Sequence, residues 1–224
     1  MSCCYHLAGH GLMNRKDTFL SLLSGFLLVL SFPKFDLEAL AWVALVPLLL
    51  ALRGKRAKEA FLLSFLTGSV FFAGLLYWIA TVSIYNKFVI FGLLLLIFYL
   101  ALYFGLFGLL YSRRKSRTTF SFRLSAFDYL YLPSLWVSLE LIRAYLFSGF
   151  PWGLLGYSQY LNLPLIQISS FTGVYGVSFL IVLVNVAIAN CIPSTGHKLY
   201  PGGHRRVIPW RAQAGYTLAG TGGL

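Results

Sequence analysis

The sequence predicts an all-α fold, a polytopic bundle of transmembrane helices with about six membrane segments, one of them re-entrant or broken. Three observations support this prediction. Of the 224 residues, 58% are hydrophobic and 11% are charged, whereas a soluble domain carries roughly 25% charged residues. The apolar residues form runs long enough to enter a membrane as helices. The basic residues gather in the short segments between these runs, as they do in membrane proteins.

Six apolar regions follow one another along the chain. The first two are short, so we expect them to be tilted as a pair or to span the membrane only partly. The sixth is too long for one span of about 20 residues, and Gly173 and Gly176 divide it into a half-segment and a full span. The expected segments are 18–32, 37–52, 60–80, 88–111, 127–147, and the divided pair 163–171 and 174–192.

The segments outside these spans are read from their composition. The first run is as short as the core of a signal peptide, but no small-residue cleavage site follows it, so we expect it to stay in the membrane. A tight turn is expected from Pro33 to Asp36. Residues 1–17 are expected to form a cytoplasmic segment, with Met13 as an alternative start. Residues 193–224 are rich in Gly and Pro and are expected to be a disordered or aberrant tail after the transmembrane domain at 18–192.

The basic residues predict the orientation of the chain. With the N-terminus in the cytoplasm, 15 of the 18 Lys and Arg residues lie on the cytoplasmic side. The opposite side has Lys34 and Lys87, and Arg143 lies inside a span. The same clustering argues against nucleic-acid binding despite the net charge of +12, because no basic, aromatic-interleaved motif is present.

Several classes of site are not predicted. Cys3, Cys4 and Cys191 have no disulfide-framework spacing and are interpreted as free thiols. All four histidines lie in the terminal segments without metal-site spacing, so neither a metal nor a cofactor is expected. No catalytic residue is predicted in this chain.

Glu140 and Arg143 are the first candidate site residues. Their i, i+3 spacing places them on one face of the fifth segment. Ionisable residues inside a membrane helix are costly and often functional. The alternative is a structural ion pair that locks helix packing, and the sequence leaves both possibilities open.

The uncharged loop at 148–160 contains the other candidates. It is rich in Gly and aromatic residues and is expected on the outer side of the membrane. One interpretation is an interfacial aromatic belt, and a sharper one is a re-entrant surface that receives a lipid acyl chain. The candidate lipid-binding or structural residues here are Phe150, Pro151, Trp152, Tyr157 and Gln159.

Residues 18–190 resemble the membrane region of the apolipoprotein N-acyltransferase family. The features that carry this resemblance, in order, are Leu30-Ser31-Phe32-Pro33, Trp42 to Leu48, Gly68 to Phe72, Tyr77-Trp78-Ile79, Trp136 with Glu140 and Arg143, Gly149 to Trp152, Gly156 to Gln159, Gln167, and Gly173 to Phe179. The resemblance implies a multi-pass protein of the bacterial inner membrane. It also implies a phospholipid acyl donor and a lipoprotein acceptor, with transfer through a cysteine thioester.

The resemblance also implies a Glu-Lys-Cys catalytic set in a nitrilase-like domain, which we expect this chain to lack. After residue 190 the sequence departs from the family pattern, so we expect a truncated or frame-shifted form that is inactive alone. Cys191 is not expected to replace the nucleophile, because it lies at the cytoplasmic end of a span without a nearby base. The alternative is a non-catalytic membrane module that binds lipid or a partner. A small transporter using Glu140 and Arg143 is a weaker option, since the internal symmetry typical of transporters is not evident.

Overall fold

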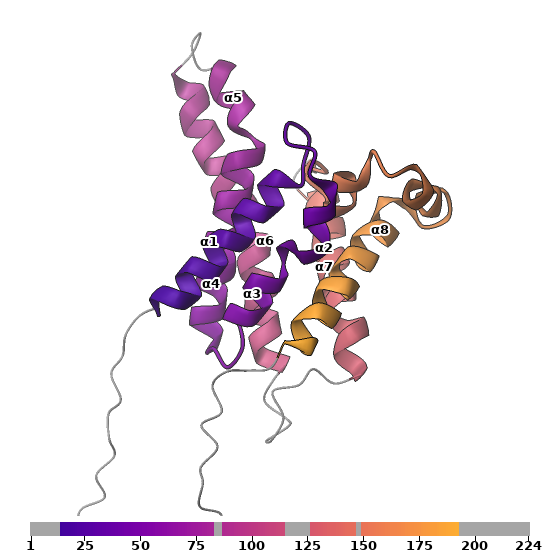
Figure 1. Cartoon of the computed structure of the whole chain (residues 1–224). Coiled ribbons are helices and arrows are strands. Elements are labelled where there is room, and N and C mark those ends of the chain that lie inside the picture. Colours follow the sequence, from indigo (N-terminus) through magenta and orange to yellow (C-terminus); the bar gives the residue numbers. More distant parts are fainter. Residues whose placement is uncertain (1–13, 83–86, 115–125, 147–148, 193–224) are drawn as a thin grey trace, which may run out of the picture. The chain divides into compact units, whose positions relative to one another are not determined.

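A computed structural model of the chain describes residues 14–82, 87–114, 126–146 and 149–192. Every regular element in these residues is a helix (Figure 1), which confirms the predicted all-α class. The described residues belong to one compact unit, Met1–Pro193. The predicted tail at 193–224 and most of the predicted N-terminal segment at 1–17 lie outside the described residues.

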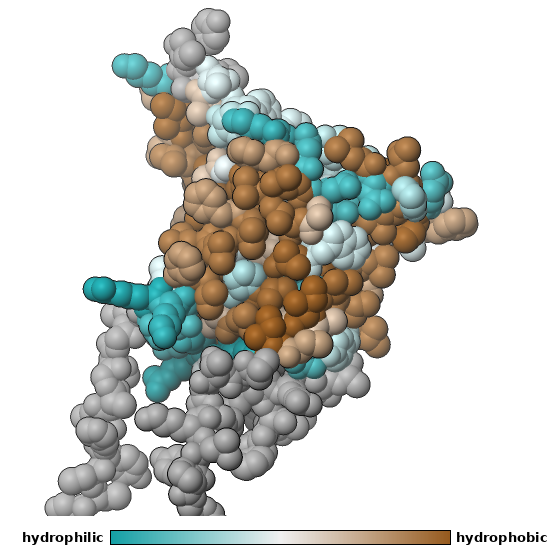
Figure 2. Space-filling view, viewed as in Figure 1, coloured by the Kyte–Doolittle hydropathy of each residue, from teal (hydrophilic) through white to brown (hydrophobic). Residues whose placement is uncertain are grey.

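Three described helices are long and apolar enough to cross a membrane: α4 (Ala57–Leu75), α6 (Phe88–Arg114) and α8 (Leu163–Cys191). In α6, only 22% of the most apolar stretch is buried within the protein, so its remaining surface suits hydrocarbon. Figure 2 shows hydrophobic side chains over the middle of the helical unit and hydrophilic ones gathered near the beginning of α1 (Arg15–Leu30). These features place the chain in a membrane, and the number of six segments stays a prediction.

α1 and the turn after it agree closely with the prediction. The helix begins after Asn14, whose side chain accepts a hydrogen bond from the amide of Lys16. It ends before a turn in which the amides of Phe35 and Asp36 both donate to the carbonyl of Phe32. The positive φ angles of Lys34 (108°) and Asp36 (55°) allow the chain to reverse there. The predicted tight turn from Pro33 to Asp36 is therefore confirmed.

The second apolar run, predicted as a short segment at 37–52, is helical but interrupted. It consists of η1 (Glu38–Leu40), α2 (Ala41–Ala44) and α3 (Val46–Ala51), with Leu45 between the last two. Pro47 lacks an amide proton and so weakens helical hydrogen bonding at this point. The buried side chain of Asn185 on α8 supplies partners instead. Its Oδ1 accepts from the amide of Leu45 at 2.9 Å, and its Nδ2 donates to the carbonyl of Ala41 at 2.9 Å.

The third run is also divided, although one undivided segment was expected. The predicted segment at 60–80 becomes α4 and a short helix, α5 (Tyr77–Val82), with Leu76 between them. α4 packs against α6 through small residues. A Cβ atom added to Gly108 would lie 2.2 Å from Oγ of Ser64 and 2.3 Å from the carbonyl oxygen of Ala60. Close approach of the two helices therefore depends on glycine at this position.

α7 (Ala126–Tyr145) and α8 correspond to the fifth and sixth apolar regions. α8 contains a break at Gly173, whose φ of 66° and ψ of −177° are not helical, so the predicted broken segment is confirmed. Its last turn is held by Arg53, whose guanidinium donates to the carbonyls of Ala189 and Ile192. A loop between α3 and α4 thereby caps the end of α8.

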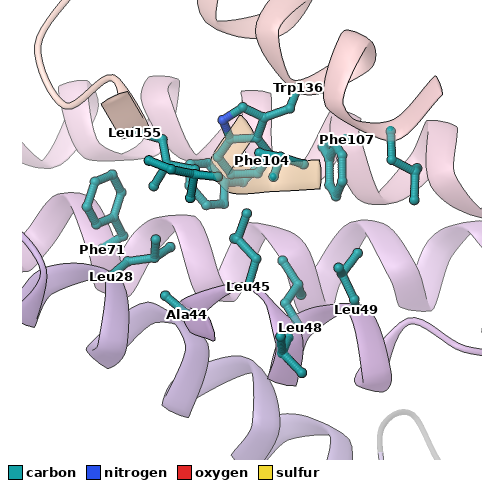
Figure 3. Close-up of a cluster of buried hydrophobic side chains, with 14 of the residues drawn as sticks. Leu28, Ala44, Leu45, Leu48, Leu49, Phe71, Phe104, Phe107, Trp136 and Leu155 are labelled. Atoms are coloured by element: carbon teal, nitrogen blue, oxygen red, sulfur yellow. The ribbon is translucent and has the colours of Figure 1, made fainter. Parts of the chain in front are cut away.

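The hydrophobic core lies where the short helices meet the long ones (Figure 3). Leu45 and Leu48 from the broken second run are almost completely buried. On the opposite side of the cluster, Trp136 of α7 stacks edge-on against Phe104 and Phe107 of α6, with ring centroids 4.9 and 5.1 Å apart. This aromatic cluster forms one wall of the candidate site.

Candidate functional site

The segment after α7 folds back onto the helix that precedes it. The amide of Phe150 donates to the carbonyl of Arg143 at 3.0 Å. Gly149 has a φ of 76°, and a Cβ atom there would lie 2.1 Å from the carbonyl oxygen of Ala144. Only glycine fits this reversal. The loop then continues into η4 (Leu155–Gln159), which packs on α8.

Glu140 joins the loop to α7. Its carboxylate is 5% exposed, and its Oε1 accepts hydrogen bonds from the indole of Trp136 at 3.0 Å and from the amide of Leu155 at 2.7 Å. The next amide, that of Gly156, donates to Oγ of Ser178 on α8 at 2.8 Å. The beginning of η4 is thus anchored to both α7 and α8.

Arg143 binds the same loop one turn further along α7. Its side chain is 3% exposed, donates to the carbonyl of Gly153 at 3.3 Å, and lies 5.2 Å from the ring centre of Phe72. Both residues belong to the described part of the chain, and no contact within 4.0 Å joins the guanidinium to the carboxylate of Glu140. The ion pair that the i, i+3 spacing suggested is therefore not formed directly. Each charge binds the loop instead.

Glu140 and Arg143 both line a small cavity of about 20 Å³. This volume holds about one water molecule. Among the described residues, Oε2 of Glu140 and Nε of Arg143 have no hydrogen-bond partner although both are buried. A buried charge is strongly destabilising unless polar groups compensate it. The cavity is consequently the point in the bundle where a small polar group would be stabilised. It is lined by Tyr103, Phe104, Phe107, Trp136, Leu139, Glu140, Arg143 and Gly153.

A much larger apolar groove, of about 620 Å³, lies along the other half of α6. Its walls are one face of α6 and the residues at the end of α7 and the beginning of the loop. Two tyrosines one helical turn apart connect it with the cavity. Tyr99 lines the groove, Tyr103 lines the cavity, and their hydroxyl oxygens are 2.6 Å apart. The groove is lined by Gly92, Leu95, Leu96, Phe98, Tyr99, Leu102, Leu146, Gly149 and Phe150.

The structure separates the candidate residues of the loop into different roles. Phe150 lines the groove, and the half-exposed Trp152 ring lies 5.9 Å from it and 5.4 Å from Trp78. Pro151 and Tyr157 are also exposed. Trp152 and Trp78 therefore form an exposed aromatic pair next to the groove, as expected for a loop at a membrane surface.

Gln159 does not face the groove or the solvent. It is 1% exposed, accepts from the indole of Trp42 at 3.1 Å, and donates to the carbonyl of Glu38 at 2.8 Å. Its neighbour Tyr160 donates to Oδ1 of Asp36 at 2.6 Å, and this bond to the protonated phenol raises the pKa of Tyr160. Both residues fasten the loop to the segment that follows α1.

The residues of α6 were not predicted as part of the site. Gly92, Tyr99 and Tyr103 lie within a continuous apolar run whose residues all suit a lipid-facing helix. The signal available in the sequence was the pair of tyrosines at i, i+4 and a glycine in the same run. Among the described residues, no group of three potential metal ligands occurs, and Cys191 is exposed at the end of α8.

The fold and the site define a helical membrane domain with an apolar groove beside a buried polar cavity. Residues 24–187 match the model of the apolipoprotein N-acyltransferase N-terminal domain. The chain belongs to the apolipoprotein N-acyltransferase family.

Individual relatives support this membership. Over 183 residues the chain is 48% identical to the apolipoprotein N-acyltransferase of Geobacter metallireducens, covering 80% of this chain and 34% of the relative. It is 35% identical over 181 residues to the enzyme of Thermotoga maritima, covering 75% and 34%. It is 33% identical over 181 residues to that of Pasteurella multocida, covering 78% and 32%. The matched part of this chain thus spans about a third of the length of these relatives.

Proposed function

We propose that this chain is the membrane part of an apolipoprotein N-acyltransferase and that it holds the phospholipid acyl donor. The observation that carries the proposal is the apolar groove beside the buried cavity of Glu140 and Arg143. The groove suits an acyl chain, because its walls are aliphatic and aromatic and its helix faces hydrocarbon. The tyrosine pair and the cavity supply polar atoms at its edge, which suits the ester and headgroup region of the same lipid.

A matched pair of variants tests lipid binding. Leu95 lines the groove and is 60% exposed, whereas its neighbour Leu94 is 61% exposed and does not line it. The detergent-purified chain is titrated with dipalmitoyl phosphatidylethanolamine, and retained lipid is counted by native mass spectrometry. We expect saturable retention, which Leu95→Gln weakens and Leu94→Gln leaves unchanged. Absence of saturable retention, or equal effects of both substitutions, would contradict the proposal.

We do not assign the transfer step to any described residue. The cysteine among them, Cys191, is exposed at the end of α8 that the loop charges predict to be cytoplasmic. We expect that this chain alone does not acylate a lipoprotein. The test is to express it with a reporter lipoprotein in cells depleted of their own enzyme and to determine the acyl chains at the reporter's N-terminus by mass spectrometry. Triacylated reporter would contradict this expectation.

We also propose that the chain lies in the bacterial inner membrane with its N-terminus in the cytoplasm. The distribution of basic residues supports this orientation, and the Trp78–Trp152 pair then lies at the outer surface. Single cysteines introduced at Lys34 and at Lys58 in a chain without its native cysteines test it. A membrane-impermeant maleimide should label the first in intact spheroplasts and the second only after lysis, and the reverse result would overturn the orientation.

A further inference from the structure

Gly92 of α6 is a glycine that helix packing does not explain. A Cβ atom added there would meet no atom of the described residues within 4 Å. By contrast, a Cβ added to Gly68 or Gly108 would collide with the partner helix at 2.8 or 2.2 Å. Gly92 is also not among the described glycines with a positive φ. Neither close approach of another helix nor backbone geometry therefore requires glycine at this position.

A glycine inside a helix is unfavourable relative to alanine, because it increases the backbone entropy that folding must overcome. Small residues in membrane helices usually allow a second helix to approach, but within the described residues no atom lies close enough to Gly92 to require this. The side of the helix where its side chain would stand is empty space that belongs to the apolar groove. The absent side chain is thus part of the volume of the groove.

Gly92 lies at one end of the row of α6 residues that line the groove. Along α6 the lining residues begin at Gly92 and end at Leu102, a distance of about 15 Å at 1.5 Å per residue. Gly92 therefore stands at one end of the groove. Because Gly92 lines this end of the groove, a larger side chain at position 92 would narrow it there.

We propose that Gly92 is a specificity-determining residue that keeps one end of this groove open for an acyl chain of a membrane phospholipid. The occupant is an alkyl chain because α6 is exposed to hydrocarbon here, with Leu95 60% exposed in the groove and its neighbours Phe91 and Leu94 exposed outside it. Attraction between chain and groove comes from close packing, since hydrocarbon surrounds both. The inference rests on the proposed function, and it identifies the residue that limits what the groove accepts.

A graded series of substitutions tests the role of Gly92. Gly92→Ala, Gly92→Val and Gly92→Leu are prepared with Leu94→Trp, which adds bulk on the same helix outside the groove. The full chain is purified in detergent and titrated with dipalmitoyl phosphatidylethanolamine, and retained lipid and thermal midpoint are both measured. We expect retention to fall stepwise with side-chain volume, by about tenfold for leucine, which corresponds to roughly ten lost carbon–carbon contacts. The thermal midpoint should not fall for Gly92→Ala, because alanine favours the helix.

The outcomes separate this inference from the proposed function. If the unsubstituted chain retains no lipid saturably, the proposed function fails and the inference fails with it. If it retains lipid but Gly92→Leu retains just as much, the inference alone is overturned. Equal losses of lipid retention in Gly92→Leu and Leu94→Trp would also overturn it. Added bulk anywhere on α6 would then be enough to weaken lipid binding. A stepwise loss at position 92 with unchanged Leu94→Trp supports it.

Discussion

The amide of Leu155 donates a hydrogen bond of 2.7 Å to Oε1 of Glu140, which also accepts the indole N–H of Trp136. This contact holds the loop against α7 beside the buried cavity, which Glu140 lines. A buried carboxylate that accepts two hydrogen bonds fixes the position of both donors. Its negative charge still needs further polar partners to offset the cost of burial. The loop is therefore positioned by the same residue that leaves an unpartnered oxygen, Oε2, in the buried cavity.

Replacing Glu140 by alanine should destabilise the chain by about 2–3 kcal/mol, because two buried donors lose an acceptor. Glu140→Gln keeps a carbonyl oxygen at this point and should retain most of the stability. Thermal unfolding in detergent, followed by circular dichroism, measures both. If the glutamine variant is as unstable as the alanine variant, the hydrogen bonds are not what Glu140 contributes.

Asn185→Leu should destabilise the chain by about 2–4 kcal/mol, because it leaves the buried amide of Leu45 and the carbonyl of Ala41 without partners. The control is Ser170→Ala, since this exposed serine bonds only a carbonyl of its own helix, that of Gln167. Protein yield and thermal midpoint in detergent are compared. Equal midpoints for the two variants would mean that the break between α2 and α3 needs no support from α8.

Arg53→Ala should lower stability by about 1 kcal/mol, because the carbonyls of Ala189 and Ile192 lose their cap. Lys58→Ala removes a charge of the same sign from the exposed beginning of α4 and serves as the control. Limited proteolysis near the end of α8 should accelerate in the first variant only. Unchanged cleavage in Arg53→Ala would contradict a capping role.

Gly108→Ala should destabilise the contact between α4 and α6 by about 1–3 kcal/mol, since its Cβ would overlap Ser64 and Ala60. The matched control is Gly92→Ala on the same helix, where the added methyl meets open space. Thermal midpoints in detergent should fall for the first and not for the second. A fall of equal size in both would show that α6 tolerates no methyl group at either position.

Trp152→Ala, placed at the equivalent position of a full-length relative, should lower acyl transfer more than protein level. The exposed Trp152 ring packs on Trp78 and Phe150 beside the groove, so its loss alters that surface without opening the core. Transfer to a reporter lipoprotein is measured by mass spectrometry and normalised to enzyme measured by immunoblot. Parallel losses of both would indicate a structural role for Trp152.

The amino-acid sequence by itself determined the fold class, the turn after the first helix and the break in α8. These features depend on local chemistry: long apolar runs, Pro33 before the turn, and Gly173 in a backbone conformation that other residues adopt rarely. The order of its motifs also identified the family that the comparisons then showed. The sequence did not indicate the interruption of the second run, because Leu45 at that interruption is held by a residue 140 positions away, Asn185.

The tertiary structure alone decided what the polar residues of the site contact. Glu140 and Arg143 share a helix face as expected, yet each binds the loop rather than the other. The sequence offered Gln159 as a lipid-binding or structural residue, and its amide joins Trp42 and Glu38, which are more than 100 residues earlier in the chain. The groove arises only where α6 meets the end of α7. Partners and cavities depend on packing between distant segments, and the periodicity of one segment contains no information about that packing.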